Sequence, residues 1–499
     1  MLKQQKPFKR GAGILIPVAS LPSPYGIGTF GKAAYELLDF LRAAGQSYWQ
    51  VLPLGPTSYG DSPYQSFSAF AGNPYYIDLD MLIEEGLLDK EEVEAHPWGD
   101  TPDDVDYGTI YKERFKVLRL ACSRSNHATT KEYKAFCAAN GWLTDYALFM
   151  ALKEQHQGEG WQSWEPPLRM REPAAIAEST KALATELDFW RFCQYKFFQQ
   201  WDALVAYAHN NGIEIIGDIP IYVAMDSADV WVNSHLFRLD EARNPVAVSG
   251  VPPDMFSATG QLWGNPLYDW DRMEQEGFVW WQQRMAASAR LYDIIRIDHF
   301  IGIVNFYSIP AEDDTAAGGH WVEGPGEKLL EAITPALGGK HIVAEDLGVL
   351  TPAVKRLRQK SGYPGMKLMQ FAFDSDANNE FLPCHFDKNT VIYGGTHDNE
   401  TLVGYFSTRK RKELRFAREY LRVKRNSEIP WALICAGYES SANTAIYQLQ
   451  DLMGLDNHAR INTPSTLGQN WRWRLLPGQL SNALAEKINA ATKLYGRCV

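Results

Sequence analysis

Short apolar runs of β-type residues recur along this chain and alternate with helix-forming stretches. Seven clear runs are residues 13–20, 48–54, 213–220, 294–299, 341–346, 366–371 and 390–395, and a weaker eighth is residues 461–466. Helical patterns lie between them, for example in residues 31–44, 352–360 and 411–424. Apolar strands that alternate with helices predict a parallel sheet buried on both faces. Eight such units predict an α/β fold of the TIM (β/α)8 barrel class.

The uneven spacing of these strands predicts where the barrel carries insertions. Residues 1–81 are expected to be the first part of the barrel, and residues 201–499 the remainder. Residues 82–200 are mostly helix-forming, which predicts a large helical inserted subdomain. Residues 224–285 form a second inserted segment, rich in Pro, Gly and Trp and too long to be a bare loop. Within it, we expect residues 251–270 to be a lid.

The composition excludes several classes of protein. The chain has 49 Lys and Arg against 60 Asp and Glu, a net charge of −11, which argues against binding to nucleic acid or to an anionic membrane. Its apolar stretches fall short of the roughly 20 residues that a membrane span needs. Its six cysteines are scattered without a CxxC pair, a pattern typical of free thiols in a reducing compartment. We therefore expect a cytoplasmic protein with neither a disulfide framework nor a zinc site.

Four of the predicted strands end in a carboxylate, namely Asp218, Asp298, Glu345 and Asp398. Side chains at the C-terminal ends of barrel strands surround one site. A single acid there is often only a helix cap, but four of them favour a shared site. Acids without Cys and His metal ligands are typical of glycosidic-bond chemistry, in which one carboxylate attacks and another carboxyl group donates a proton. Packing acids together raises the pKa of one of them. Arg296 shares a strand face with Asp298 and can keep it ionised.

Aromatic residues are abundant, with 16 Trp, 24 Tyr and 23 Phe. Most are expected in the core, but some can line a groove, because sugar rings stack on aromatic faces. Tyr64, Phe256, Trp263 and Tyr268 accompany the polar strand ends in this way. The acids alone leave a metal-assisted hydrolase and a non-catalytic carbohydrate-binding barrel open. The first would need more His ligands at the strand ends, and the second has no use for four clustered acids.

Ten motifs, in order over nearly the whole chain, match one family. They are LPSPYGIG from Leu21, WQVLPLGPT from Trp49, DSPY from Asp61, GDIPIY from Gly217, GVPPDMFS from Gly250, QLWGNP from Gln261, RIDHF from Arg296, AEDLG from Ala344, THDNET from Thr396 and NWRWR from Asn470. The chain thus resembles the amylomaltase (4-α-glucanotransferase, disproportionating enzyme) family, a branch of the α-amylase-like glycoside hydrolases.

The resemblance implies a retaining enzyme that transfers a segment of an α-1,4-glucan to the 4-OH of an acceptor glucose or glucan. It implies that Asp298 is the nucleophile, Glu345 the general acid and base, and Asp398 the transition-state stabiliser. The implied substrate-binding residues are Tyr64, Asp218, Arg296 and His397 together with Asp254, Phe256, Gln261 and Trp263 of the lid. Malto-oligosaccharides and α-1,4-glucans are the expected partners, and no cofactor or metal is expected. An α-amylase-like retaining hydrolase stays open as an alternative, because the same acids would serve hydrolysis. The sequence does not determine the preferred chain lengths, the metabolic pathway or the oligomeric state.

Overall fold

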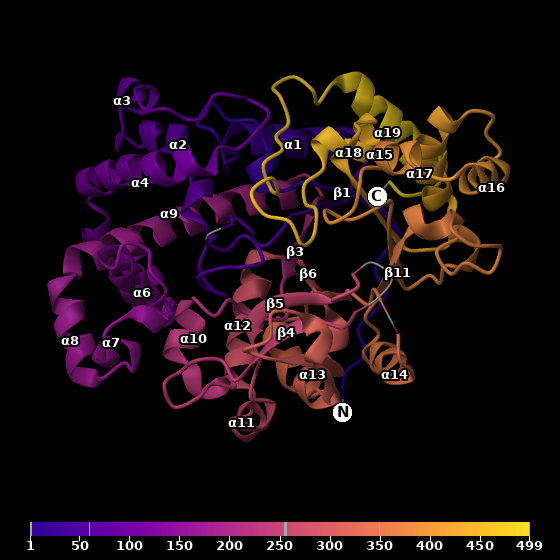
Figure 1. Ribbon diagram of the computed structural model, residues 1–499. Helices are drawn as coiled ribbons and strands as arrows, with labels where there is room; N and C mark the ends of the chain where they lie inside the picture. The colour runs from indigo at the N-terminus through magenta and orange to yellow at the C-terminus, as the bar shows by residue number, and fades with distance from the viewer. Residues whose placement is uncertain (1, 59, 254–256, 349, 499) are drawn as a thin grey trace.

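A computed structural model gives the structure of residues 2–58, 60–253, 257–348 and 350–498, which form an eight-stranded parallel sheet with its surrounding helices (Figure 1). The sheet consists of β1 (Gly11–Leu15), β2 (Tyr48–Gln50), β3 (Glu214–Ile219), β6 (Ile294–Ile297), β9 (His341–Ala344), β10 (Gly365–Leu368), β11 (Thr390–Tyr393) and β12 (Thr444–Gln448). These strands follow one another around the sheet in chain order, and β12 returns to pair with β1. Between β9 and β10, the Ala344 N–H donates to the Pro364 carbonyl at 3.0 Å. The sheet is a nearly closed TIM barrel, as predicted.

Side chains along each barrel strand alternate between the interior and the surrounding helices. On β3, Ile216 packs in an inner cluster with Ile294 of β6 and Ile446 of β12, whereas Ile215 packs in the outer core. Because the period of a strand is two residues, positions further along the inner row reach the C-terminal mouth of the barrel. The barrel interior is therefore a packed core with a polar mouth.

The predicted eighth strand is wrong. Residues 461–466 are irregular, and the last barrel strand is β12, which lies between α17 (Ile429–Glu439) and α18 (Leu449–Met453). The sequence of β12, TAIYQ, begins and ends with polar residues, yet all five residues are buried. Its assignment as a strand therefore depends on the neighbouring strands β1 and β11, which a local pattern does not reveal.

In its described residues, the connection from β2 to β3 contains eight α-helices that gather on one side of the barrel, drawn from indigo to magenta in Figure 1. They are α2 (Leu79–Glu84), α3 (Lys90–Glu94), α4 (Tyr107–Arg124), α5 (Lys131–Ala139), α6 (Leu143–Gln155), α7 (Pro166–Arg169), α8 (Pro173–Ala182) and α9 (Ala184–Asn210). The long helix α9 joins this helical part to the barrel. Its buried Trp201 contacts the rings of Trp49 on β2 and Phe30.

A second, antiparallel sheet was not predicted from the sequence. It has the order β5 (Gln261–Pro266), β4 (Ala247–Val251), β7 (Asn305–Pro310) and β8 (His320–Glu323). The β4–β5 hairpin overlaps the predicted lid, residues 251–270. Asp254 and Phe256 of that lid lie outside the described residues.

The remaining helices cover the rest of the barrel. They are α1 (Lys32–Ala43), α10 (Ala228–Val232), α11 (Trp270–Gln275), α12 (Val279–Leu291), α13 (Glu327–Ile333), α14 (Pro352–Ser361), α15 (Leu402–Ser407), α16 (Arg411–Leu421) and α19 (Asn482–Leu494), besides α17 and α18. After α19, the buried Arg497 guanidinium donates to the carbonyls of Gly11 at 3.0 Å and Tyr438 at 2.8 Å, so it ties β1 to the end of α17. Among the described residues, no helix is both long and apolar enough to span a bilayer.

Candidate active site

The register of the barrel strands brings the predicted acids to one mouth. In the β6–β9 pair, Ile297 lies opposite Ala344, so both strands end at the same level. Asp298 and Glu345 are the next residues on each strand. The Glu345 N–H still donates to the Ile297 carbonyl at 3.1 Å, which continues the ladder past the last paired residue. These two side chains therefore start from adjacent positions at the barrel mouth.

Arg296 connects two of the carboxylates. On the neighbouring strand β3, Asp218 lies opposite Arg296 in the register. The buried guanidinium reaches Asp218 Oδ2 at 2.5 Å through Nη1 and Asp298 Oδ1 at 2.9 Å through Nη2. Burial alone would lower the pKa of Arg296, but the two carboxylates outweigh it and raise that pKa well above its usual value. The Asp298 side chain, 29% exposed, is thus held as an oriented carboxylate that remains open to the cleft.

Glu345 occupies a contrasting environment. Its carboxyl group is buried, and its two oxygens accept the backbone N–H groups of His299 at 2.7 Å and Leu347 at 2.8 Å. These bonds and the nearby Arg296 favour the ionised form, but burial outweighs them and raises the pKa of Glu345 to about 8. The negative charge of Asp298 acts in the same direction as burial. Glu345 is therefore protonated at neutral pH and can donate that proton.

His299 shapes the wall beside these two acids. Its backbone is left-handed, with φ 50°, a conformation uncommon for a residue other than glycine. This turn directs its N–H to Glu345. Burial lowers the pKa of His299 to about 4, so its imidazole is neutral at neutral pH. The Trp263 ring of β5 lies edge-on against it, with ring centroids 4.8 Å apart. The antiparallel sheet thus brings an aromatic side chain to the barrel mouth.

Asp398 lies five residues after the end of β11, and its main hydrogen-bond partners come from a later segment of the chain. Asn462 Nδ2 donates to Asp398 Oδ1 at 2.6 Å, and Arg460 Nη2 donates to the Asp398 carbonyl at 2.8 Å. On the other side, Oδ2 lies 3.3 Å from His397 Nε2. The Tyr64 hydroxyl lies 2.9 Å from that same nitrogen and donates to Asp218 at 2.9 Å. Tyr64 and His397 therefore link the Asp218 side of the mouth to the Asp398 side.

Asp298, Glu345 and Asp398 open into a cleft of about 630 Å³ that Gln261 and Trp263 also line. This volume falls within the roughly 300–1,000 Å³ of typical ligand sites. Carboxylates beside aromatic faces suit a sugar, which has hydroxyl edges and apolar faces. A larger cavity of about 1120 Å³ involves α5, α9 and α12, but it has none of the predicted site residues. The smaller cleft, which contains the predicted acids, is therefore the candidate active site.

The similarity of this chain to known proteins agrees with the chemistry inferred for this cleft. A family model described as 4-alpha-glucanotransferase matches residues 16–480. The chain belongs to the 4-α-glucanotransferase family. The predicted resemblance, the glycosyl-transferring enzyme class and 4-α-glucanotransferase activity are thereby confirmed.

Individual members of the 4-α-glucanotransferase family are similar along the full chain. The 4-alpha-glucanotransferase of Clostridium butyricum is 48% identical, with 96% of this chain and 99% of that relative covered. The enzyme of Thermus thermophilus is also 48% identical, with 98% and 99% covered. Among solved structures, the amylomaltase from Streptococcus agalactiae in complex with acarbose is 39% identical, with a TM-score of 0.96. That match covers 98% of this chain and all of the solved chain.

Every predicted site residue that the structure describes lies at this mouth or in a direct contact network with it. The structure adds residues that the sequence analysis did not select, namely Arg460, Asn462 and Trp471. The Trp471 ring lies 6.0 Å from that of Tyr64 and 5.9 Å from that of His397. Trp471 is part of the NWRWR motif, which was the available signal for it. Asn462 lies in the segment wrongly predicted as a strand, so its role was missed.

Proposed function

We propose that this 4-α-glucanotransferase acts on α-1,4-glucans by a retaining double displacement. Asp298 attacks the anomeric carbon of the donor while Glu345 protonates the departing glycosidic oxygen, so the C–O bond breaks and a glycosyl–Asp298 ester forms. Glu345, now ionised, then takes the proton from the 4-OH of an acceptor. That oxygen attacks the anomeric carbon, and the carboxylate of Asp298 leaves.

The observation that carries this proposal is the contrast between the two carboxyl environments. Asp298 pairs with Arg296 at 2.9 Å and stays partly exposed, which suits a nucleophile. Glu345 is buried, and burial raises its pKa to about 8, which suits a proton donor at neutral pH. A nucleophilic carboxylate beside a carboxyl group that can donate a proton is the arrangement that glycosidic chemistry requires.

The other residues position the sugar and these two groups. We assign Asp398, held by Asn462, as the group that binds sugar hydroxyls as positive charge develops on the ring. Tyr64, Asp218 and His397 form the hydrogen-bonded frame behind it, and Arg296 orients the nucleophile. These residues are expected to make the donor site rigid, because each of them is hydrogen-bonded to a residue from a different segment of the chain.

Transfer requires that a sugar hydroxyl reaches the intermediate in preference to water. The β4–β5 hairpin lines the cleft with Gln261 and Trp263, whose side chains are joined by a 3.2 Å hydrogen bond from Nε1 to Oε1. We propose that this hairpin, with Asp254 and Phe256 of the same segment, is the lid that clamps the acceptor. The acarbose complex of the similar amylomaltase supports malto-oligosaccharides as substrates.

Trapping the intermediate tests the assigned roles. With a donor that carries a very acidic leaving group, Glu345→Gln is expected to form the ester but not to resolve it, because deglycosylation still needs the base. Mass spectrometry should then find the glycosyl group on Asp298. A label on another residue, or the absence of any rescue by the activated donor, would overturn the assignment. Maltotriose supplies the accompanying product test: glucose plus a ladder of longer chains indicates transfer, and reducing ends without redistribution indicate hydrolysis.

We also propose the cytoplasm as the compartment and residues 82–200 as a helical subdomain inserted in the barrel. The first follows the cysteine pattern of the sequence, and the helices α3 to α8 within those bounds support the second. Cell fractionation tests the compartment. Limited proteolysis tests the subdomain, which is expected to resist cleavage as one unit together with α9, the helix that joins it to the barrel.

A further inference from the structure

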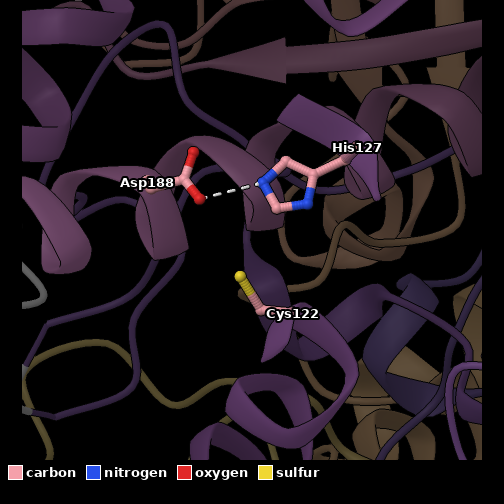
Figure 2. A group of neighbouring side chains, drawn as sticks. All are labelled: Cys122, His127 and Asp188. Atoms are coloured by element: carbon pink, nitrogen blue, oxygen red, sulfur yellow. Dashed lines mark hydrogen bonds and ion pairs between the residues drawn. The ribbon is translucent and has the colours of Figure 1, made fainter. Parts of the chain in front are cut away.

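Three side chains of the helical part lie together (Figure 2), and none of them lines the cleft at the barrel mouth. Cys122 is near the end of α4, His127 begins the short 3-10 helix His127–Thr129, and Asp188 is in the first half of α9. One ligand atom from each (a sulfur, a ring nitrogen and a carboxylate oxygen) lies within 4.8 Å of the other two. None of the three takes part in the chemistry proposed above.

The imidazole of His127 is fixed with one nitrogen toward the other two groups. Its side chain is 4% exposed, and Nε2 lies 3.1 Å from Asp188 Oδ2. The ring packs against Tyr133 and Phe192, with centroids 4.7 and 4.9 Å away. Among the described residues, the buried Nδ1 has no hydrogen-bond partner. Nε2 faces the Asp188 carboxylate, so we take it as the ring nitrogen that belongs to this cluster.

The carboxylate of Asp188 is also held in place. The Tyr133 hydroxyl donates to Oδ1 at 3.0 Å, which leaves Oδ2 facing His127. Such a hydrogen bond from outside the ligand set is the usual way in which proteins orient a metal-binding carboxylate. The Asp188 side chain is 41% exposed, so an ion and a water molecule can reach the cluster from solvent.

We propose that Cys122, His127 and Asp188 bind a borderline-soft divalent cation, with Zn²⁺ as the best match. Thiolate, imidazole and carboxylate are the three ligand types that Zn²⁺ takes in proteins, and water supplies the fourth position. Zn²⁺ bond lengths separate tetrahedral ligand atoms by roughly 3.3–3.7 Å, so side-chain shifts of about 1 Å close the site. The thiol proton of Cys122 leaves to solvent as the sulfur–metal bond forms, and His127 coordinates with its proton on Nδ1.

A nucleophilic Cys–His–Asp triad is the other function of this residue set, and the geometry argues against it. In a triad the nucleophile and the carboxylate bind opposite nitrogens of the imidazole. Here one ring nitrogen lies within 4.8 Å of both the thiol and the carboxylate. That convergence on a common point is the arrangement of a metal site. The bound ion would join the end of α4 and the segment after it to α9, and so stabilise the helical part.

Cobalt is the probe that tests this proposal, because a thiolate bound to Co²⁺ gives a distinctive charge-transfer absorption. The full chain, freed of metals with a chelator, is titrated with Co²⁺ and then with Zn²⁺. One Co²⁺ per chain is expected to give the thiolate band, and Zn²⁺ is expected to displace it. Cys122→Ser, which is nearly isosteric, should abolish the band, and Asp188→Asn should weaken Co²⁺ binding at least about tenfold.

Cys435→Ser is the matched control, since Cys435 is a similarly half-buried thiol on α17. This variant is expected to keep the thiolate band. Zn²⁺ is expected to raise the melting temperature of the unaltered chain and of this variant alike. The proposal is overturned if the unaltered chain gives no thiolate band, or if Cys122→Ser retains it. Because these readouts are spectroscopic and thermal, their failure leaves the glycosyl-transfer mechanism unaffected.

Discussion

Burial of the Glu345 carboxyl predicts how activity depends on pH. The pKa of about 8 belongs to the free enzyme, and the acid form is the one that starts the reaction. As the pH rises through about 8, that form is lost, so kcat/KM for maltotriose should fall about tenfold per pH unit on the alkaline side. A donor with a very acidic leaving group does not need the proton, and its first step should keep its rate across the same range. An alkaline limb common to both donors would contradict the assignment.

Asn462 offers a test of the Asp398 position. Its side chain donates to Asp398 Oδ1 at 2.6 Å, and hydrogen bonds to charged groups are worth about 1.5–3 kcal/mol. If this energy holds Asp398 in its catalytic position, Asn462→Ala is expected to lower kcat roughly 10- to 150-fold. Exposed Asn426→Ala serves as the control and should leave kcat unchanged. An unaffected kcat in Asn462→Ala would show that Asp398 needs no such support.

Much of this site could be predicted at the level of single residues, for a physical reason. Asp298 and Glu345 directly follow apolar strands, and the ends of parallel strands meet in space. Asn462 has no such local signal, because it reaches Asp398 from a segment without helix or strand periodicity. The Cys122, His127 and Asp188 cluster was missed for a similar reason: its third member is 61 residues beyond the second. The scattered cysteines, without a CxxC pair, predict no zinc site.

At the scale of elements, the β4–β5 hairpin carries the prediction about product choice. Phe256 of the predicted lid lies outside the described residues, so Trp263 provides the test of the lid. An aromatic contact is worth about 0.5–1.5 kcal/mol. Trp263→Ala is therefore expected to raise the ratio of hydrolysis to transfer about two- to twelvefold, measured as new reducing ends against redistributed chains.

Trp321→Ala is the matched control for this hairpin. Trp321 belongs to β8 of the same antiparallel sheet, is 48% exposed and does not line the cleft. It should leave the product ratio unchanged. An equal change in both variants would assign the effect to the sheet as a whole rather than to a clamp on the acceptor.

The strands that were predicted can be recognised from their local sequence, whereas those that were missed depend on pairing with distant strands. Residues 294–299 and 341–346 each contain a short apolar stretch that ends in an acidic residue, and β6 and β9 lie within them. By contrast, β7 has the sequence NFYSIP, whose polar residues conceal a strand from a search for buried runs. It is a strand because β4 and β8 pair with it on both sides. Pairing of this kind is a tertiary property, so it escapes a reading of local sequence.

For the whole molecule, Arg497 predicts how stability depends on barrel closure. Its buried guanidinium donates to several carbonyls, among them those of Gly11, Tyr438 and Ala442. Arg497→Ala would remove these hydrogen bonds, although Arg10 also donates to the carbonyls of Tyr438 and Ala442, so we expect a loss of about 1–3 kcal/mol in the free energy of unfolding. Arg497→Lys keeps the charge but lacks the planar guanidinium group. Its free energy of unfolding should therefore lie between those of the unaltered chain and Arg497→Ala. Thermal or denaturant unfolding measures both, and an Ala variant as stable as the unaltered chain would contradict the prediction.

The pairing of β1 with β12 also affects how the chain is made. Gly13 of β1 lies opposite Ile446, so a ribosome must add more than four hundred residues after the first strand before its partner exists. At about 5–20 residues per second, this takes on the order of half a minute or more. During that time one edge of β1 has no strand beside it, and an open edge invites pairing with other chains. The same contact that completes the barrel therefore leaves the nascent protein with an exposed strand edge until its last strand emerges.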